Sequence, residues 1–296
     1  FVFDRHDESE SWPKILDTKA LFITSPNNTH FEYLCKLKES SYKGYVYCEK
    51  PVLNDVSKID RVEGLDHTRN FFGFNFRFSD IPCIVEHISQ KYDLEHCIRL
   101  EVNVAYPFVL QKNYKKSWKS SSKYCPLGVL ENLGIHFIDF TIQSLGRPKY
   151  ASSYLRNLDE NSDTYDWSQT DIVFQNNSTA TICNSYATSY RNEVRFTFLR
   201  GEILIDDRGV TLIHPRDSFD SNELSTRPPS IVADQRSLDD LFSTSLRTCV
   251  NYFLSYVKNN EDIPRKDFEN SILSIQTMLK SADKSEKTTA HVKIRS

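Results

Sequence analysis

The sequence lacks the features that would place it in a membrane, secreted or nucleic-acid-binding class. No apolar run reaches the roughly 18 residues of a membrane span, and no signal-peptide pattern is present. The formal net charge is only −3, so no basic surface for nucleic acid is expected. At 296 residues with 39% hydrophobic content, the chain can bury a large core. We therefore expect a cytoplasmic protein of two domains, with no nucleic-acid or membrane partner.

Paired cysteines are also lacking. The chain has seven cysteines, an odd number, and none forms a Cys-x-x-Cys pair. Free thiols in a reducing compartment are the expected state, and no metal site is expected.

Glycine is scarce, with eight residues, and no Gly-x-Gly-x-x-Gly turn occurs. Phe1–Arg5 nevertheless resembles the second strand of a dinucleotide-binding fold, whose terminal acid binds the adenosine ribose. Asp4 would then favour NAD over NADP, although Arg5 could accept a 2′-phosphate and Asp4 could be a surface turn residue. Either the sequence is truncated before Phe1 or the protein has lost the phosphate-binding turn. The intact downstream motifs favour truncation.

A strand, loop, helix and strand follow one another in the first part of the chain. The strands are expected at 19–24 and 45–48, with a helix at 30–40 between them, which is the unit of a parallel sheet. The polar segments 25–30 and 49–51 then fall at the carboxyl ends of the strands, where open α/β sheets bind ligands. A lysine at that edge can act as an acid, a base or a fixed charge. By itself, Glu49-Lys50-Pro51 is better interpreted as a solvated charge pair before a strand-ending proline.

The second part of the chain is typical of an α+β domain. Alternation predicts a strand at 97–105, with Ile98, Leu100, Val102 and Val104 on one face. Further strands are expected at 171–175, 179–188, 193–199, 202–206, 210–213 and 291–294, and helices at 81–89, 130–145, 237–257 and 267–279. Tight turns between strands indicate an open-faced, antiparallel sheet. Its second face is expected to carry apolar residues from 179–213 and to be covered in a homodimer or homotetramer.

Four motifs occur in order along the chain. They are Thr24-Ser25-Pro26-Asn27 with His30, Cys48-Glu49-Lys50-Pro51, Gly73-Phe74-Asn75-Phe76-Arg77-Phe78, and the segment from Gly128 through Asn132, Gly134 and His136 to Asp139. They resemble the ATPN-x-x-H, CEKP, G-x-N-x-R-F and G-x-L-x-D-x-G-x-H-x-x-D motifs of the Gfo/Idh/MocA oxidoreductases, the family of glucose-fructose oxidoreductase and inositol dehydrogenase.

The resemblance implies an α/β plus α+β fold. A Rossmann-type parallel sheet, N-terminally incomplete in this sequence, would occupy residues 1–78. An open-faced, mainly antiparallel sheet with helices would occupy residues 79–296. The resemblance also implies NAD(P)-dependent hydride transfer at a hydroxyl or ketone carbon of a sugar, cyclitol or nucleotide-sugar, without naming the substrate.

The same resemblance assigns catalysis to Lys50, Asn132 and His136. Lys50 would stabilise the developing alkoxide, and His136 would be the general acid/base because imidazole titrates near neutrality. Asn132 and His136 are four apart and share a helix face. Asn132 stands where the family pattern has aspartate, so it cannot raise the histidine pKa by ion pairing. Glu131 cannot simply replace that aspartate, because adjacent helix positions point about 100° apart.

The expected cofactor-binding residues come from all of these segments. They are Asp4, Arg5, Thr24, Ser25, Pro26, Asn27, His30, Glu49, Lys50, Arg77 and Trp118. Asn27 and His30 could instead cap the following helix, and Arg77 could be a surface charge. The basic loop around Trp118 could attract an anionic substrate such as a nucleotide-sugar, or simply be solvated.

Two other functions remain open at this point. The absent glycine turn and Asn132 are also typical of a non-catalytic, degenerate family member that acts as a dimeric binding or regulatory protein. The same motifs would also fit an aromatic dihydrodiol dehydrogenase.

Overall fold

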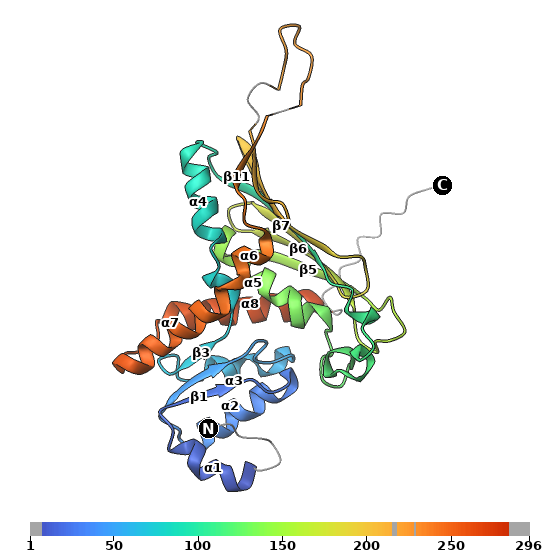
Figure 1. Cartoon of the computed structure of the whole chain (residues 1–296). Helices are drawn as coiled ribbons and strands as arrows, with labels where there is room; N and C mark the ends of the chain where they lie inside the picture. The colour runs from blue at the N-terminus through green and yellow to red at the C-terminus, as the bar shows by residue number, and fades with distance from the viewer. Residues whose placement is uncertain (1–7, 215–217, 228, 284–296) are drawn as a thin grey trace.

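The computed structural model describes residues 8–214, 218–227 and 229–283. It contains a small and a large sheet with helices packed between them (Figure 1). Asp4, Arg5 and the strand expected at 291–294 lie outside the described residues, so the structure does not test them.

The small sheet has three parallel strands in the order β1-β2-β3. They are β1 (Ala20–Ile23), β2 (Tyr45–Cys48) and β3 (Asn70–Phe72), and the helices of this part are α1 (Glu8–Leu16), α2 (His30–Glu39) and α3 (Ile59–Glu63). All four residues of the central strand β2 are buried, as expected for a strand covered on both faces. Ile23 pairs with Cys48, so β1 and β2 end at the same edge. The expected Rossmann-type parallel sheet is confirmed.

The large sheet has eight strands in the order β11-β10-β9-β8-β4-β7-β6-β5. They are β4 (Cys97–Ala105), β5 (Pro148–Arg156), β6 (Trp167–Phe174), β7 (Thr179–Ser185), β8 (Arg191–Phe198), β9 (Gly201–Asp206), β10 (Gly209–Ile213) and β11 (Ser230–Asp234). The pairing is antiparallel except between β4 and β7, which confirms a mainly antiparallel sheet. The edge strands β5 and β11 were not expected, because their largely exposed residues show no regular alternation.

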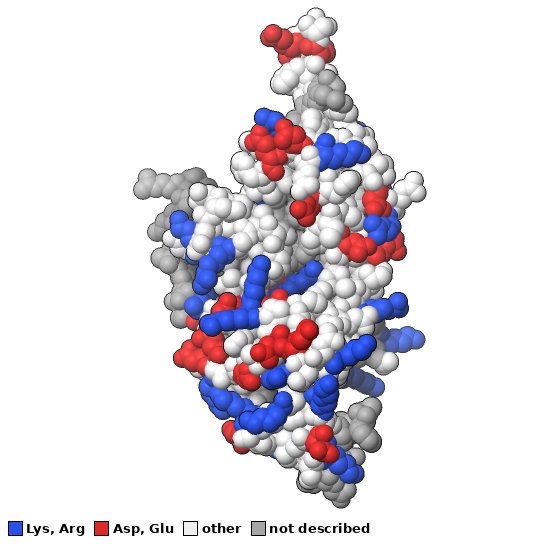
Figure 2. All heavy atoms as spheres, turned by 90° about the vertical axis from the view of Figure 1, so that its left-hand side faces the viewer, with Lys and Arg blue, Asp and Glu red and all other residues white. Residues whose placement is uncertain are grey.

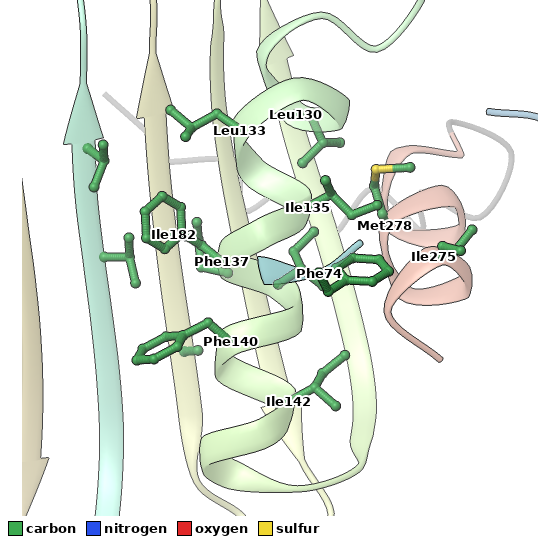
Figure 3. Close-up of a cluster of buried hydrophobic side chains, with 14 of the residues drawn as sticks. Phe74, Leu130, Leu133, Ile135, Phe137, Phe140, Ile142, Ile182, Ile275 and Met278 are labelled. Carbon is green, nitrogen blue, oxygen red and sulfur yellow. The ribbon is translucent and has the colours of Figure 1, made fainter. Parts of the chain in front are cut away.

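The second part of the chain has the helices α4 (Ile81–Lys91), α5 (Ile135–Leu145), α6 (Leu238–Ser243), α7 (Ser245–Asn259) and α8 (Arg265–Ala282). Of these, α5, α6 and α8 pack on the inner face of the large sheet. Helix α5 packs on β4 and β7, and α8 packs on α5 and β5. Figure 3 shows Phe137 and Phe140 of α5 directed toward the strands, with Ile275 and Met278 of α8 on its other side. The expected helix 237–257 is divided at Thr244, and its capping box of Ser237 and Asp240 is present.

The outer face of the large sheet is mostly polar, so the expected apolar second face is wrong. Glu101 lies opposite Arg195, whose guanidinium also bonds Glu202 at 2.7 Å and lies 3.6 Å from Glu193. A bulge between Cys97 and Arg99 leaves Ile98 39% exposed, so Ile98 does not share the buried face of β4. The homodimer or homotetramer stays a prediction, but apolar burial on this face does not support it.

The C-terminal helices contact both sheets. Phe253 of α7 packs against Tyr45, Tyr47 and Phe71 of the small sheet, while α8 contacts both β3 and β5. A boundary at Phe78 therefore stays a prediction, because residues far beyond it complete the core of the small sheet.

The surface carries charges of both signs. In Figure 2, Lys and Arg are interspersed with Asp and Glu over one face, and acidic side chains gather at the upper tip. No helix of the described residues has the length and apolar character needed to cross a membrane. All seven cysteines are free, as expected.

Candidate functional site

Lys50 lies just beyond the carboxyl end of β2. Strand pairing continues on both sides up to this point, with Glu49 N bonded to Ile23 O at 2.9 Å and Gly73 N to Cys48 O at 2.8 Å. The Lys50 ammonium then donates from Nζ to the carbonyl oxygen of Asn132 at 2.5 Å. Burial lowers the pKa of Lys50 to about 8, against the opposing effect of Glu49. Lys50 can therefore change its protonation state near neutral pH.

His30 joins the loops that follow β1 and β2. Its Nδ1 lies 2.8 Å from Pro51 O and its Nε2 lies 2.7 Å from Ser25 O. The ring is 1% exposed, and burial lowers its pKa although the two carbonyls raise it. Both ring nitrogens are therefore used inside the protein. His30 makes no helix-capping bond, since Thr29 is the N-cap of α2.

The other side chains of the loop after β1 lie in different surroundings. Asn27 is buried, and its Nδ2 lies 3.5 Å from Oδ1 of Asn132, so its side chain reaches the fourth motif rather than capping α2. Ser25 Oγ bonds Thr29 Oγ1 at 2.6 Å. Thr24 and Pro26 are exposed at the sheet edge, where a ligand can reach them.

Asn132 lies in a π-helical turn, Leu130–Gly134, that leads directly into α5. Such turns are frequent at functional sites. Gly128 begins the segment with φ +55°, and an added Cβ would lie 1.8 Å from Tyr165 O, so glycine is required there. The Asn132 amide donates from Nδ2 to Cys125 Sγ at 2.7 Å and to Gly128 O at 3.3 Å. The side chain of Asn132 is therefore fixed by the protein itself.

His136 stacks face to face on Phe76, with ring centroids 4.5 Å apart. Phe76 in turn stacks on Phe242 at 4.1 Å. Nδ1 of His136 is buried and has no hydrogen-bond partner among the described residues. Burial and the charge of Lys50 together lower the pKa of His136 well below its usual value. The imidazole is therefore neutral at physiological pH and free to accept a proton.

Glu131 is a residue of this site that sequence reasoning missed. It is 0% exposed, and its carboxylate oxygens make no hydrogen bond of good geometry within the described part of the chain, although the Cys125 thiol and the Leu127 N–H lie close to them. Burial raises its pKa to about 7, while the adjacent Cys125 thiol, the Leu127 N–H and the charge of Lys50 lower it less. An acid between the apolar residues Leu130 and Leu133 of an expected helix is the sequence signal that could have revealed it. We refer to Lys50, Cys125, Glu131, Asn132 and His136 as the Lys50 cluster.

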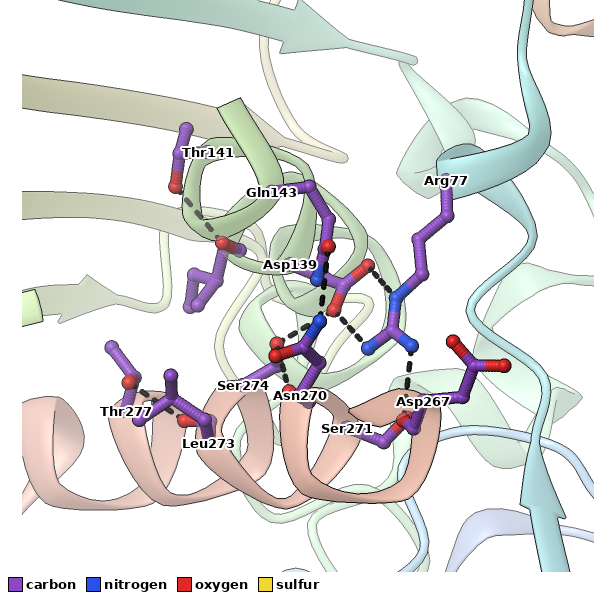
Figure 4. Close-up of polar contacts among 11 residues, drawn as sticks. Arg77, Asp139, Thr141, Gln143, Asp267, Asn270, Ser271, Leu273, Ser274 and Thr277 are labelled. Atoms are coloured by element: carbon purple, nitrogen blue, oxygen red, sulfur yellow. Dashed lines mark hydrogen bonds and ion pairs between the residues drawn. The ribbon is translucent and has the colours of Figure 1, made fainter. Parts of the chain in front are cut away.

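Arg77 lies elsewhere, in a second buried group. Its Nε and Nη2 donate to the two oxygens of Asp139 at 2.8 and 2.6 Å, and its Nη1 donates to Asp267 O at 3.2 Å. Ser274 Oγ also donates to Asp139, at 2.6 Å (Figure 4). The Arg77 and Asp139 side chains are 10% and 1% exposed, so the interpretation of Arg77 as a surface charge is wrong. We refer to Arg77, Asp139 and Ser274 as the Arg77 cluster.

Glu49 and Trp118 lie at the margin of the Lys50 cluster. Glu49 is partly buried, accepts a 3.4 Å hydrogen bond from Tyr47 Oη, and has a raised pKa because of burial. The Trp118 ring lies 5.7 Å from Nζ of Lys119. The charge of Lys119 lowers the pKa of Lys50, so the basic loop approaches the cluster.

Comparison with known proteins gives one family match. Residues 97–203 match the family model described as the GFO/IDH/MocA C-terminal domain. No curated protein was found to match the sequence.

Solved structures match over most of the chain. An oxidoreductase from Thermotoga maritima is 17% identical, with a TM-score of 0.68 over 95% of this chain and 81% of its own. A 3-ketoreductase from Actinomadura kijaniata, in complex with NADP and TDP-benzene, is 15% identical, with a TM-score of 0.68 over 91% and 80%. A UDP-N-acetylglucosamine 3-dehydrogenase from Acidithiobacillus ferrooxidans is 15% identical, with a TM-score of 0.63 over 91% and 80%.

The solved structures show that the fold is shared. The family match covers residues 97–203, which run from β4 into β9 of the large sheet. Both findings agree with the resemblance indicated by the four motifs: residues 97–203 match the GFO/IDH/MocA C-terminal domain, and a Rossmann-type parallel sheet precedes them.

Proposed function

We propose that this protein is an NAD(P)-dependent oxidoreductase that moves a hydride between the nicotinamide and a hydroxyl or ketone carbon of a sugar, cyclitol or nucleotide-sugar. The observation that carries the proposal is the convergence of three separate motifs on one buried polar group. Lys50 from the end of β2 bonds the main chain of Asn132, Asn27 from the end of β1 approaches its side chain, and His136 follows one turn later. The structural neighbours that bind NADP or act on nucleotide-sugars support the same reaction class.

The residues of the Lys50 cluster suit this chemistry. NAD(P), when bound, supplies the carbon that takes or gives the hydride. During alcohol oxidation, Lys50 Nζ holds the substrate oxygen and stabilises the negative charge that develops there. The neutral imidazole of His136 accepts the hydroxyl proton, and it returns the proton in the reverse direction. Asn132 orients the substrate through a neutral amide and contributes no charge.

The chain also offers groups for the cofactor. The fit rests on polar atoms left without partners, above all Nδ1 of His136, and on the exposed loop residues Thr24 and Pro26 at the carboxyl edge of the small sheet. With Ser25, Asn27 and Glu49 they would line the dinucleotide. His30 would support that loop rather than contact the cofactor. Arg77 would support the fold, and Trp118 would approach the nicotinamide side. The preference for NAD over NADP rests on Asp4 and stays a prediction.

The test is a hydride-transfer assay that follows NADH and NADPH absorbance with a panel of sugars, cyclitols and nucleotide-sugars. Lys50→Ala and His136→Ala should each lower turnover by about 10²–10⁴-fold, the usual contribution of such groups. Both variants should stay folded by circular dichroism. Trp12→Phe, a change remote from the cluster, is the matched control and should keep full turnover.

Two outcomes would contradict the proposal. Undiminished turnover in His136→Ala would remove His136 from the reaction. Absence of any hydride transfer, with cofactor shown to be bound by fluorescence, would favour a non-catalytic binding or regulatory protein. The neutral Asn132, at a position where the family pattern has aspartate, is consistent with that alternative.

A further inference from the structure

Glu131 is a buried acid to which the proposed reaction gives no role. Its side chain is 0% exposed, and within the described residues its oxygens have only the Cys125 thiol and the Leu127 N–H close by, without a hydrogen bond of good geometry. A carboxyl group in such a place is costly unless its charge acts on another group. A cation is held at the next residue, where the carbonyl oxygen of Asn132 accepts a hydrogen bond from Nζ of Lys50.

We propose that Glu131 is a positioning residue of the active site, whose carboxylate supplies to Lys50 the negative charge that Asn132 lacks. The inference rests on the proposed function in that Lys50 is the group placed at the reacting oxygen. Glu131 does not touch the substrate. It favours the ammonium form of Lys50, which is the form that stabilises an alkoxide.

The direction of the Lys50 side chain explains how an adjacent residue can do this. Lys50 bonds the main chain of Asn132 rather than its side chain, so its ammonium group lies at the π turn. The charge of an acid on the adjacent residue, Glu131, can therefore act on Lys50 whichever way the Asn132 side chain points. The Asn132 amide is meanwhile committed to Cys125 and Gly128. Glu131 thus gives Lys50 the negative charge that an aspartate at position 132 would supply, but it does not give that charge to His136.

The charged and titratable neighbours of the two groups are few. Glu131 faces the Cys125 thiol and Lys50. Lys50 faces Glu49, Lys119, Cys125 and Glu131, and its charge also acts on the imidazoles of His30 and His136. Lys119 opposes the ammonium form of Lys50, whereas the two glutamates favour it, so loss of Glu131 leaves Glu49 as the remaining carboxylate.

The experiment titrates Lys50 directly. Lysine labelled with ¹³C at Cε is incorporated into the 296-residue chain, and Lys50→Met identifies the Lys50 signal by its loss. In the wild type this signal should titrate near pH 8, as its lowered pKa requires. In Glu131→Gln the midpoint should fall by about one pH unit, the lower end of the usual effect of an opposite charge. In the double variant Glu131→Gln/Asn132→Asp it should return toward the wild-type value.

The exposed Glu39 provides the control, because Glu39→Gln removes one carboxylate and should leave the Lys50 midpoint in place. An unchanged midpoint in folded Glu131→Gln would overturn the proposal. If Glu131→Gln does not fold, the reciprocal measurement decides. The ¹³C carboxyl signal that titrates near pH 7 in the wild type should move to higher pH in Lys50→Met, and a fixed midpoint would again overturn the proposal.

These titrations need neither substrate nor cofactor. Coupled midpoints in a protein that transfers no hydride would therefore refute the proposed function and leave the charge coupling in place. Uncoupled midpoints in an active enzyme would refute the charge coupling and leave the proposed function in place.

Discussion

Two buried charged groups lie along the same helical segment of this protein and differ in how they are satisfied. In the Arg77 cluster, Asp139 accepts bonds from two guanidinium nitrogens and from Ser274, and the third guanidinium nitrogen bonds a carbonyl. In the Lys50 cluster, both oxygens of Glu131 and Nδ1 of His136 lack a hydrogen bond of good geometry within the described residues. The first cluster is complete without a ligand, and the second is not.

The difference separates stability from function. A buried ion pair whose hydrogen bonds are all made fixes the geometry of the segments that carry it, here the segment after β3, α5 and α8. Buried polar atoms left without partners are unfavourable for folding, and perturbed pKa values of several adjacent groups are typical of sites that bind and react. The structure thus anchors one face of the helical segment firmly and keeps the other ready for a ligand.

The largest expected effect on stability comes from breaking the complete cluster. Asp139→Asn leaves the buried guanidinium of Arg77 without its counter-charge, so the free energy of unfolding should fall by about 3–5 kcal/mol. Urea unfolding measures it. The control is Asp93→Asn at the exposed Arg200 pair, where the two side chains are 54% and 80% exposed and the loss should be under about 1 kcal/mol. Equal losses in the two variants would contradict the structural role of Asp139.

Glu131→Gln should change the free energy of unfolding in the opposite direction and stabilise the protein at high pH. The pKa of Glu131 rises from 4.5 unfolded to about 7 folded, so the protonated form is favoured by folding and stability is lost as pH rises from about 4.5 to 7. Compared with the wild type, the variant should gain up to about 3 kcal/mol at pH 8 relative to pH 4.5. Unfolding free energies at several pH values test this, and a difference independent of pH would refute the raised pKa.

A smaller change is expected from completing the charge set of the Lys50 cluster. Asn132→Asp places a carboxylate one turn before His136, which stabilises the imidazolium and opposes the effect of burial on the pKa of His136. The pH optimum of hydride transfer should therefore move upward by about one unit. Asn222→Asp, on the distant connection between β10 and β11, is the control. An unchanged pH optimum would show that the histidine does not titrate in the reaction.

Much of the site was predictable because it depends on local patterns. Four apolar residues followed by Glu49-Lys50 fix where β2 ends, and parallel pairing then brings the loop with Asn27 to the same edge. The i, i+4 spacing likewise put Asn132 and His136 on one helical segment.

The rest depends on contacts between distant segments. Nothing near Arg77 in sequence reveals that Asp139 and Ser274 will surround it. Glu131 looked misplaced because a regular helix was assumed, whereas the structure has a π turn and a lysine bonded to its main chain. The outer face of the large sheet was expected to be apolar because an open-faced sheet is usually covered by a partner. Most apolar residues of its central strands instead point inward, and ion pairs occupy the outside.

The most direct test of the account compares the free energies of unfolding of Lys50→Met and Arg77→Met at pH 7. The pKa of Lys50 falls from 10.5 to about 8 on folding, so its charged form opposes folding below pH 8, and Lys50→Met should be as stable as the wild type or more stable, by up to about 3 kcal/mol. Arg77→Met leaves the buried carboxylate of Asp139 without its counter-charge, so the free energy of unfolding should fall by about 3–5 kcal/mol. If Lys50→Met loses as much stability as Arg77→Met, the Lys50 cluster is a structural element and the assignment of the active site is wrong.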